Sequence, residues 1–469
     1  MRVLLVLLAV LAMPASGQTT PGWQPTLTEA GVDPSLHGVW QSRGYGWVFE
    51  VGPDGAMGYD VSATGCLEPE SQTPEEVASW ARVFRMEGRA LVVSTQPENA
   101  TRYTFDPISA VPEACGAPLG ASAQEVFDYA WTVMDEHYAF FDLFGVDWDA
   151  RRSEIAPRIR DGMSEPDLFD ALVDLLDGLN DAHLVLQGEV DGESRRHRGK
   201  GAAVLGPLLQ TAFEAQDEVA SMGAFANAWF AENQRRIQDE VLDDGTVVTV
   251  GDDDIVWGRR GRIGYLFVTG MSPERFAPEA PIEAQIDSVH AVLDRALTDL
   301  SDTDALVLDV ALNQGGSDRV GLAIASHFAN APSTGLTKVA YGPEAAAPQP
   351  IAVVPASGVR YLKPVSVLTT GVTLSAAETF VLQMRALPTV THIGEVTRGA
   401  LSDVLFKPLP NGWMLRLSNE IYRDAEGELW EGRGIAPDVP VTVFSRGDLA
   451  GHTTALAGVM DWLGRTLES

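Results

Sequence analysis

The chain has 469 residues, 45% of them hydrophobic, which is enough for roughly two to four domains with large buried cores. Its formal net charge of −32 at pH 7 argues against nucleic acid or an anionic membrane surface as a partner and is typical of a soluble protein. Lysine is scarce, which restricts the residues available as a catalytic amine; it stands only at Lys200, Lys338, Lys363 and Lys407.

The first 17 residues predict a signal peptide. Arg2 is followed by an apolar run over residues 3–13 and then by Pro14-Ala15-Ser16-Gly17, a pattern typical of secretory signals. The run is too short to span a bilayer, and Gln18 rather than a cysteine follows the expected cleavage site. We therefore expect an exported protein, periplasmic or secreted, without a membrane span or a lipid anchor.

Residues 18–118 predict a β-rich domain. Residues 47–51 and 57–61 flank Pro53-Asp54-Gly55 and indicate a hairpin. Cys66 and Cys115 both lie in this region, and export permits a disulfide between them, worth ~4 kcal/mol in the chain-entropy model. Two cysteines without a His/Cys cluster of ligand spacing predict no metal site, and no cofactor is expected.

A helical domain is predicted over residues 119–190. Ser122 and Glu125 form a capping-box pattern ahead of apolar residues at helical spacing, and a second helix begins near Ser164 and stops at Gly178. The turn Asn180-Asp181-Ala182-His183 then leads into an apolar strand.

Residues 191–254 are predicted to form a linker and a helical insert. The charged stretch 190–202 favours a solvated loop over an anion site. Residues 207–242 favour helices whose aromatic side chains serve in helix packing, and no PDZ domain is recognised here.

From residue 255 to 448 strands alternate with helices, which predicts an α/β domain with a mostly parallel central sheet. The expected strands include 263–268, 305–310 and 364–369, the expected helices include 282–300, and residues 404–442 are rich in hairpins. A C-terminal helix over 449–469 is expected to bury Leu456, Val459, Met460 and Leu463.

Ser375 stands where the strand 364–369 turns into a helical pattern. A serine at such a turn can be a nucleophile with its oxyanion at the positive end of a helix, or an ordinary N-cap. Gly315-Gly316, also after a buried strand, can donate backbone N–H groups to an oxyanion or form a plain turn. No Lys-Ser/Thr follows this pair, which excludes a P-loop. Of the eight histidines, His183 alone stands at a helix-to-strand turn beside an aspartate, although a lone histidine is more often structural.

Six segments occur in the order typical of one protease superfamily. They are Asp181-Ala182-His183, Gly264-Tyr265-Leu266, Asp309 with Asn313-Gln314-Gly315-Gly316, Ser375-Ala376-Ala377-Glu378, Gly394-Glu395-Val396-Thr397-Arg398-Gly399 and Glu431-Gly432-Arg433-Gly434-Ile435-Ala436-Pro437-Asp438. Residues 120–445 thereby resemble the C-terminal processing peptidase/tricorn-core superfamily of serine proteases. The resemblance implies a crotonase-like (ClpP/crotonase) α/β catalytic domain that hydrolyses peptide bonds.

The same resemblance implies the roles of the site residues. The processing-peptidase branch has a lysine base where Ala400 stands here, so the serine–lysine design is disfavoured. The tricorn branch matches His183 as general base and Glu431 in a supporting carboxylate network, with Ser375 as nucleophile. The oxyanion hole would comprise the backbone N–H groups of Gly315 or Gly316 and of Ala376.

Two departures from the family pattern bear on these roles. Ala182 replaces the serine that precedes the histidine in tricorn, so part of the supporting network is in doubt, and Ala311 replaces an arginine common after the Asp309 strand.

The sequence thus predicts an exported serine peptidase that acts on peptides or unfolded proteins through an acyl-enzyme. The alternative is a non-catalytic protein that binds an apolar ligand, as interphotoreceptor retinoid-binding modules do. Acyl-CoA chemistry on the same fold is disfavoured by export, and homo-oligomerisation is left open.

Overall fold

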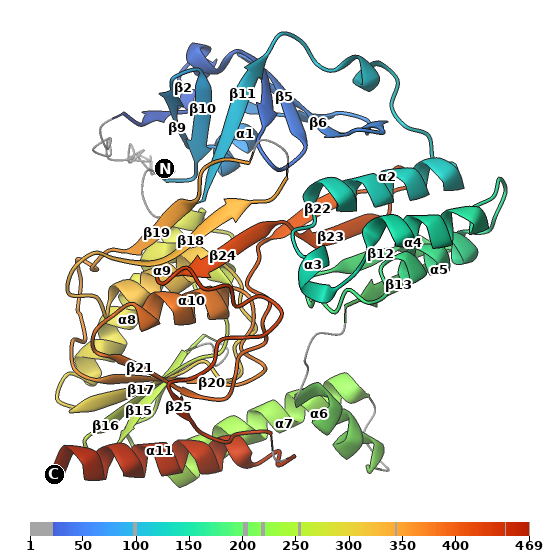
Figure 1. Ribbon diagram of the computed structural model, residues 1–469. Coiled ribbons are helices and arrows are strands. Elements are labelled where there is room, and N and C mark those ends of the chain that lie inside the picture. Colours follow the sequence, from blue (N-terminus) through green and yellow to red (C-terminus); the bar gives the residue numbers. More distant parts are fainter. Residues whose placement is uncertain are drawn as a thin grey trace, which may run out of the picture.

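The computed structural model describes residues 22–96, 101–199, 205–216, 221–251, 255–342, 345–445 and 447–468. Figure 1 shows a β domain that contains the first described strands, a group of helices beside it, and an α/β body that ends in a long C-terminal helix. The expected signal peptide at residues 1–17 lies outside the described residues.

The N-terminal domain is an antiparallel sheet with the strand order β1-β9-β10-β11-β4-β5-β6-β7, and β8 pairs with β6. The predicted hairpin is formed by β5 and β6. A helix that the sequence analysis did not identify, α1, begins after a Thr73/Glu76 capping box. The elements are β1 Gln24–Pro25, β2 Leu27–Thr28, β3 Gly31–Val32, η1 Pro34–Leu36, β4 Gly38–Ser42, β5 Trp47–Gly52, β6 Gly55–Ser62, β7 Gly65–Cys66, β8 Glu70–Gln72, α1 Pro74–Trp80, β9 Val83–Glu87, β10 Ala90–Ser94, β11 Arg102–Ile108 and η2 Glu113–Gly116.

A disulfide joins Cys66 to Cys115, with the two Cα atoms 4.9 Å apart. It ties the end of β7 to η2, the short helix at the end of this domain. Just after it, the amide of Leu119 donates to the carbonyl of Cys66 at 3.0 Å. The predicted bond therefore fixes the chain where it leaves the β domain for the helices.

The helical region comprises α2 Ala123–His137, α3 Phe141–Phe144, α4 Trp148–Ile155, η3 Ala156–Arg158 and α5 Glu165–Leu175. The capping box of Ser122 and Glu125 is present, and Ser164 caps α5 as expected. These helices bury a core that includes Phe127, Met134 and Leu172. They pack on a small antiparallel sheet with the order β13-β12-β23-β22.

This small sheet corrects the expectation that residues 190–202 form a solvated loop. Residues Val185–Val190 (β12) and Glu193–Arg198 (β13) form a hairpin instead. Asp191 and Gly192 form its turn, with φ values of 50° and 80°. An Asp-Gly pair with both residues at positive φ is the preferred two-residue hairpin turn, because its twist matches that of the flanking strands.

The α/β body is built on a sheet with the order β14-β15-β16-β17-β20-β21-β25. From β16 to β25 every pairing is parallel, in agreement with the prediction. Its strands are β14 Val248–Val250, β15 Ile255–Arg260, β16 Ile263–Val268, β17 Ala305–Asp309, β20 Val365–Thr369, β21 Val390–Gly394 and β25 Val439–Pro440.

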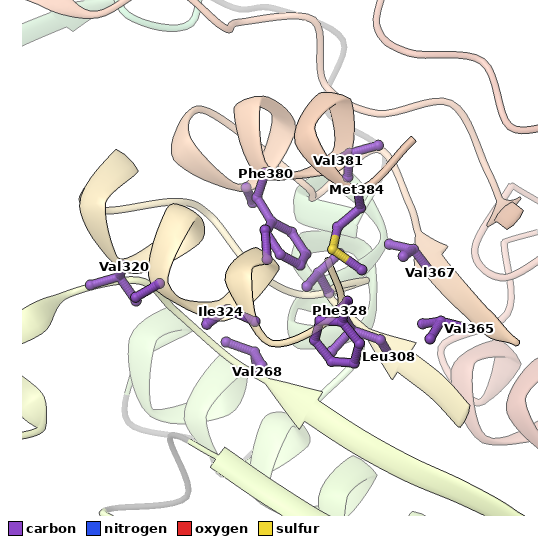
Figure 2. Close-up of a cluster of buried hydrophobic side chains, with 14 of the residues drawn as sticks. Val268, Leu308, Val320, Ile324, Phe328, Val365, Val367, Phe380, Val381 and Met384 are labelled. Carbon is purple, nitrogen blue, oxygen red and sulfur yellow. The ribbon is translucent and has the colours of Figure 1, made fainter. Parts of the chain in front are cut away.

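Helices cover both faces of this sheet. On one face lie α8 Ile282–Asp299, α9 Asp318–Ser326 and α10 Ala376–Arg385, with η5 Pro273–Arg275 before α8. Figure 2 shows side chains of α9 and α10, such as Ile324 and Phe380, packed against strand residues such as Leu308 and Val367. The other face packs on α11 Gly451–Glu468 and on the insert, which comprises α6 Leu205–Glu214, α7 Met222–Arg236 and the π-helical turn Ile237–Val241.

The insert and the C-terminal helix pack as the sequence predicts. Leu456, Val459, Met460 and Leu463 of α11 are buried. Trp229 of the insert contacts Phe444, with ring centroids 6.0 Å apart. None of the helices in the described ranges combines the length and the apolar character needed to cross a membrane.

The hairpin-rich stretch after residue 404 divides between two bodies. Strands β22 Val404–Pro408 and β23 Met414–Ser418 join the helical region, whereas β24 Glu420–Asp424 pairs with β18 Ser333–Ala340, which also pairs with β19 Gln349–Val353. The chain between β21 and β24 therefore connects the central sheet to the helical region, where the predicted histidine lies.

Candidate active site

Ser375 occupies the strained turn between β20 and α10. Its backbone has φ 60° and ψ −126°, whereas an ordinary N-cap residue has an extended backbone. A non-glycine residue persists at positive φ only where its surroundings hold it there, and such residues cluster at functional sites. Here the amide of Ser375 donates to the carbonyl of Ala400 at 3.0 Å and to the carboxylate of Glu378 at 3.3 Å.

Glu378 binds the backbone turn that faces Ser375. This fully buried carboxylate accepts hydrogen bonds from Thr397 Oγ1 at 2.6 Å, the Gly399 amide at 2.7 Å and the Ala400 amide at 2.8 Å. Burial raises the pKa of Glu378 to about 7, and these hydrogen bonds oppose the rise. Glu378 thus holds the turn through residues 397–400 against Ser375.

The glycine pair lies directly against this turn. Gly315 and Gly316 have φ values of 91° and 141°, which favour glycine. A Cβ on Gly315 would lie 2.8 Å from Ser375 Cβ and 2.9 Å from the amide nitrogen of Ala376. Only glycine allows this close approach of the two backbones.

The amides near Ser375 differ in their availability. The Gly315 amide donates to Asn313 Oδ1 at 2.8 Å, so it is already engaged. In the described part of the chain, the amides of Gly316 and Ala376 have no protein acceptor. Gly316 also lines the same cavity as Ser375. Of the three predicted oxyanion donors, Gly316 and Ala376 are therefore the two that remain free.

His183 stands at the turn between α5 and β12, where the sequence places it. Its amide donates to Asp181 Oδ1 at 2.8 Å, which fixes the turn, and its side chain is buried. Ala182, immediately before it, packs with Leu374 and Ala400 in a small buried cluster. Because Leu374 immediately precedes Ser375, this cluster brings the histidine turn against the serine turn.

The surroundings of His183 favour the neutral imidazole. Burial lowers its pKa below the ordinary value, while the charge of Asp181 and a contact with the Ser402 backbone oppose the decrease. Its Nδ1 atom is buried without a hydrogen-bond partner in the described residues. A neutral imidazole at neutral pH can accept a proton, as a general base must.

Glu431 binds the backbone segment that lies beside His183. Its Oε2 accepts hydrogen bonds from the amides of Leu401 at 2.8 Å and Ser402 at 2.9 Å, and its side chain is 2% exposed. Burial, followed by the charges of Asp181 and Glu378, raises the pKa of Glu431 well above its ordinary value. Glu431 therefore positions residues 401–402, which lie beside His183.

Neither buried lysine fits the role of a base. Lys407 is completely buried and donates to the carbonyl of Tyr45 at 2.7 Å and to Asp60 at 2.5 Å, both in the β domain. Lys338 forms a 2.6 Å ion pair with Glu420. Burial lowers the pKa of Lys338, but the nearby acidic charges, led by Glu420, outweigh it and raise the pKa above its ordinary value. At position 400 stands a buried alanine.

The cavity at Ser375 contains residues that the sequence analysis did not identify. It has a volume of about 230 Å³ and is lined by Thr95, Thr101, Tyr103, Gly316, Ser317, Asp318, Arg319, Ser375, Leu401, Asp403 and Tyr422. Burial, with the charges of Glu420 and Asp318, raises the pKa of Asp403 to about 6. The β domain forms one wall through Thr95, Thr101 and Tyr103, and no local motif signals this long-range contact.

Comparison with known families identifies the chain. Residues 262–441 match Peptidase family S41, and residues 120–177 match the Tricorn protease C1 domain. The chain belongs to peptidase family S41. This is a family of serine peptidases, and the matched regions contain the parallel strands β16 to β25 with Ser375 and the helices α2 to α5.

Solved structures share the fold of this S41 peptidase. A candidate peptidase from Parabacteroides merdae superposes with a TM-score of 0.55 at 24% identity, covering 73% of this chain and 97% of that chain. Mature CPAF superposes with a TM-score of 0.51 at 15% identity over the same shares. The fold is a ClpP/crotonase-like α/β domain, here with a helical region and an N-terminal β half-barrel.

Replacing Gly315 with alanine should disrupt the site of this S41 peptidase. The new Cβ would lie 2.7 Å from the Leu374 carbonyl oxygen, so the serine turn must move. We expect hydrolysis of a peptide substrate to fall about 100-fold, because small displacements of reacting groups cost this much. Gly427→Ala is a matched control, since Gly427 has φ 88° and nothing within 4 Å of an added Cβ. Equal activity in the two variants would contradict the assigned role of the contact.

Proposed function

We propose that this S41 peptidase hydrolyses peptide bonds in peptides or unfolded proteins through an acyl-enzyme on Ser375, with His183 as general base. The observation that carries the proposal is the strained backbone of Ser375, with φ 60°, at the N-terminus of α10 beside two free backbone amides. A helix N-terminus and preorganised N–H groups stabilise an oxyanion.

The proposed reaction has two steps. In the first, Ser375 Oγ attacks the scissile carbonyl carbon while His183 accepts the hydroxyl proton, and the amides of Gly316 and Ala376 donate to the oxyanion. The C–N bond then breaks, and His183 returns the proton to the leaving amine. In the second step His183 accepts a proton from water, whose oxygen attacks the acyl carbon. The ester bond to Ser375 Oγ then breaks, His183 returns the proton to Oγ, and the new carboxyl group is released.

The carboxylates act as positioning residues in this proposal. Glu378 and Glu431 accept hydrogen bonds from the backbone amides of residues 399–402. They thereby hold this segment between Ser375 and His183. Asp181 fixes the histidine turn and accepts a 3.1 Å hydrogen bond from the Tyr138 hydroxyl. Ala182 packs against Leu374, so the tricorn-type serine is replaced here by an apolar contact between the two turns.

A fluorophosphonate probe tests the nucleophile and the base separately. Wild-type protein should be labelled on Ser375, as peptide mapping would show, and Ser375→Ala should not be labelled. His183→Ala should lower turnover of a peptide by orders of magnitude while the thermal unfolding midpoint changes little, because only the base is lost. Labelling of Ser375→Ala at the wild-type rate would rule out the assignment.

The pH dependence of turnover tests the neutral histidine. Because burial lowers the pKa of His183, the acid limb of kcat/KM that belongs to His183 should lie below pH 6.5. Asp181→Asn removes the charge that opposes the decrease, so the midpoint of the acid limb should move to still lower pH. A midpoint above 6.5, or one that Asp181→Asn leaves unmoved, would show that another group titrates.

Export is also part of the proposal, and it rests on the signal-peptide pattern of residues 1–17 together with the Cys66–Cys115 disulfide. Expression of the full chain in a bacterial host should yield mature protein outside the cytoplasm. N-terminal sequencing should then begin at Gln18. Recovery of the intact Met1 terminus from the cytoplasm alone would contradict export.

A further inference from the structure

A second, larger cavity lies between the β domain and the hairpin of β22 and β23. Its volume is about 510 Å³. The β domain provides half-buried aromatic side chains, chiefly Trp47, Tyr59 and Trp80, and the hairpin provides Pro408 and Pro410. We call this cavity the aromatic groove. Partly exposed apolar surface gathered in one concave place is typical of a binding site.

The aromatic groove adjoins the active-site cavity at Tyr103. Tyr103 of β11 lines both cavities, and Thr101, just before β11, also lines the one that contains Ser375. Tyr103 is fixed by its neighbours, because its ring centroid lies 5.7 Å from that of Trp47 and 5.1 Å from that of Tyr45. A polypeptide bound at Ser375 would have to pass Tyr103 to reach the aromatic groove.

The segments that follow the two disulfide-bonded cysteines line this groove. Leu67 and Glu68, which follow Cys66, line the groove, as do Pro118 and Leu119 just after Cys115. The disulfide therefore holds together two segments that form one side of the groove. A rigid wall reduces the entropy lost when a flexible ligand binds.

The charge of the groove selects among ligands. Asp60 is neutralised by its 2.5 Å ion pair with Lys407. Glu68 and Glu70 are exposed and form no ion pair among the described residues. Free carboxylates beside aromatic faces favour a ligand with lysine or arginine side chains, through charge attraction and cation–π contacts.

We propose that the aromatic groove is an exosite that binds an extended segment of the substrate polypeptide, apolar and carrying lysine or arginine, away from the scissile bond. This inference rests on the proposed function and adds a substrate class to it. It gives the N-terminal β domain a substrate-binding role, in a chain where no PDZ domain is recognised at residues 191–254. Long unfolded substrates would benefit from the groove, whereas short peptides would not reach it.

The test compares one scissile sequence in two lengths, a short peptide and the same peptide extended by leucine and lysine residues. In wild-type protein the extension should lower KM about tenfold, and an extension with glutamate in place of lysine should not. In Glu68→Lys/Glu70→Lys and in Tyr59→Ala this advantage should disappear, while kcat/KM for the short peptide stays unchanged. Glu50→Lys is the matched control, because Glu50 is exposed on β5 of the same domain but does not line the groove.

Each result decides between the two proposals. Equal losses on short and long peptides, or no loss on either, overturn the exosite and leave the peptidase standing. If neither peptide is hydrolysed and Ser375 is not labelled, the peptidase proposal fails. The groove is then tested in Ser375→Ala by quenching of Trp47 and Trp80 fluorescence with the lysine-containing peptide, and no saturable quenching overturns the exosite too. If the groove variants change only the oligomeric state, measured by light scattering, the occupant is a second copy of the chain and the exosite is wrong.

Discussion

The candidate site depends on how residues 399–402 are held between Ser375 and His183. Two buried carboxylates hold this segment, Glu378 on the serine side and Glu431 on the histidine side. Each accepts hydrogen bonds from two backbone amides of the segment. Buried backbone donors must be satisfied, and a carboxylate that accepts several of them fixes the segment more firmly than a water could. The unfavourable φ of Ser375 can persist because its own amide bonds to the same segment, at the Ala400 carbonyl.

This arrangement explains why the site is assembled from distant parts of the chain. His183 belongs to the helical region, Ser375 to the central sheet, and residues 399–402 to the connection that leads from one body to the other. That connection continues into β22, which pairs with β23, and β23 pairs in turn with β12, the strand after His183. The distance between Ser375 and His183 therefore depends on how the α/β body packs against the helical region. Contacts such as that of Ala182 with Leu374 fix this packing.

The sequence predicted the elements that have strong local signals. Buried apolar runs predicted the parallel strands, and the Ser122 capping box predicted the start of α2. The change from a strand pattern to a helical pattern predicted the turn at Ser375. The hairpin at Asp191-Gly192 also has a signal in its turn residues, but the charged residues around that turn favour a solvated linker when only the sequence is considered. Its strand β13 is exposed on one side, so charge along it is compatible with pairing.

Long-range contacts had no signal of this kind. Tyr103 shares a cavity with Ser375, from which it is separated by most of the chain, and nothing local to either residue indicates the other. The four hydrogen bonds of Glu378 likewise join the serine turn to residues 397–400. No pattern in either segment indicates that the two lie together. A glutamate three residues after a serine looks like half of a capping box, and here the same carboxylate also binds the neighbouring turn.

The two buried lysines complete the argument for a histidine base. A lysine can act as a base only if burial, unopposed, lowers its pKa. Burial lowers the pKa of Lys338, but acidic charges led by Glu420, 2.6 Å away, outweigh it and raise the pKa. Lys407 donates to Asp60 of the β domain at 2.5 Å. His183 is the opposite case, because burial dominates over Asp181 and lowers its pKa. Lys338 and Lys407 thus join β18 to β24 and β22 to the β domain, whereas His183 lies next to the turn that contains Ser375.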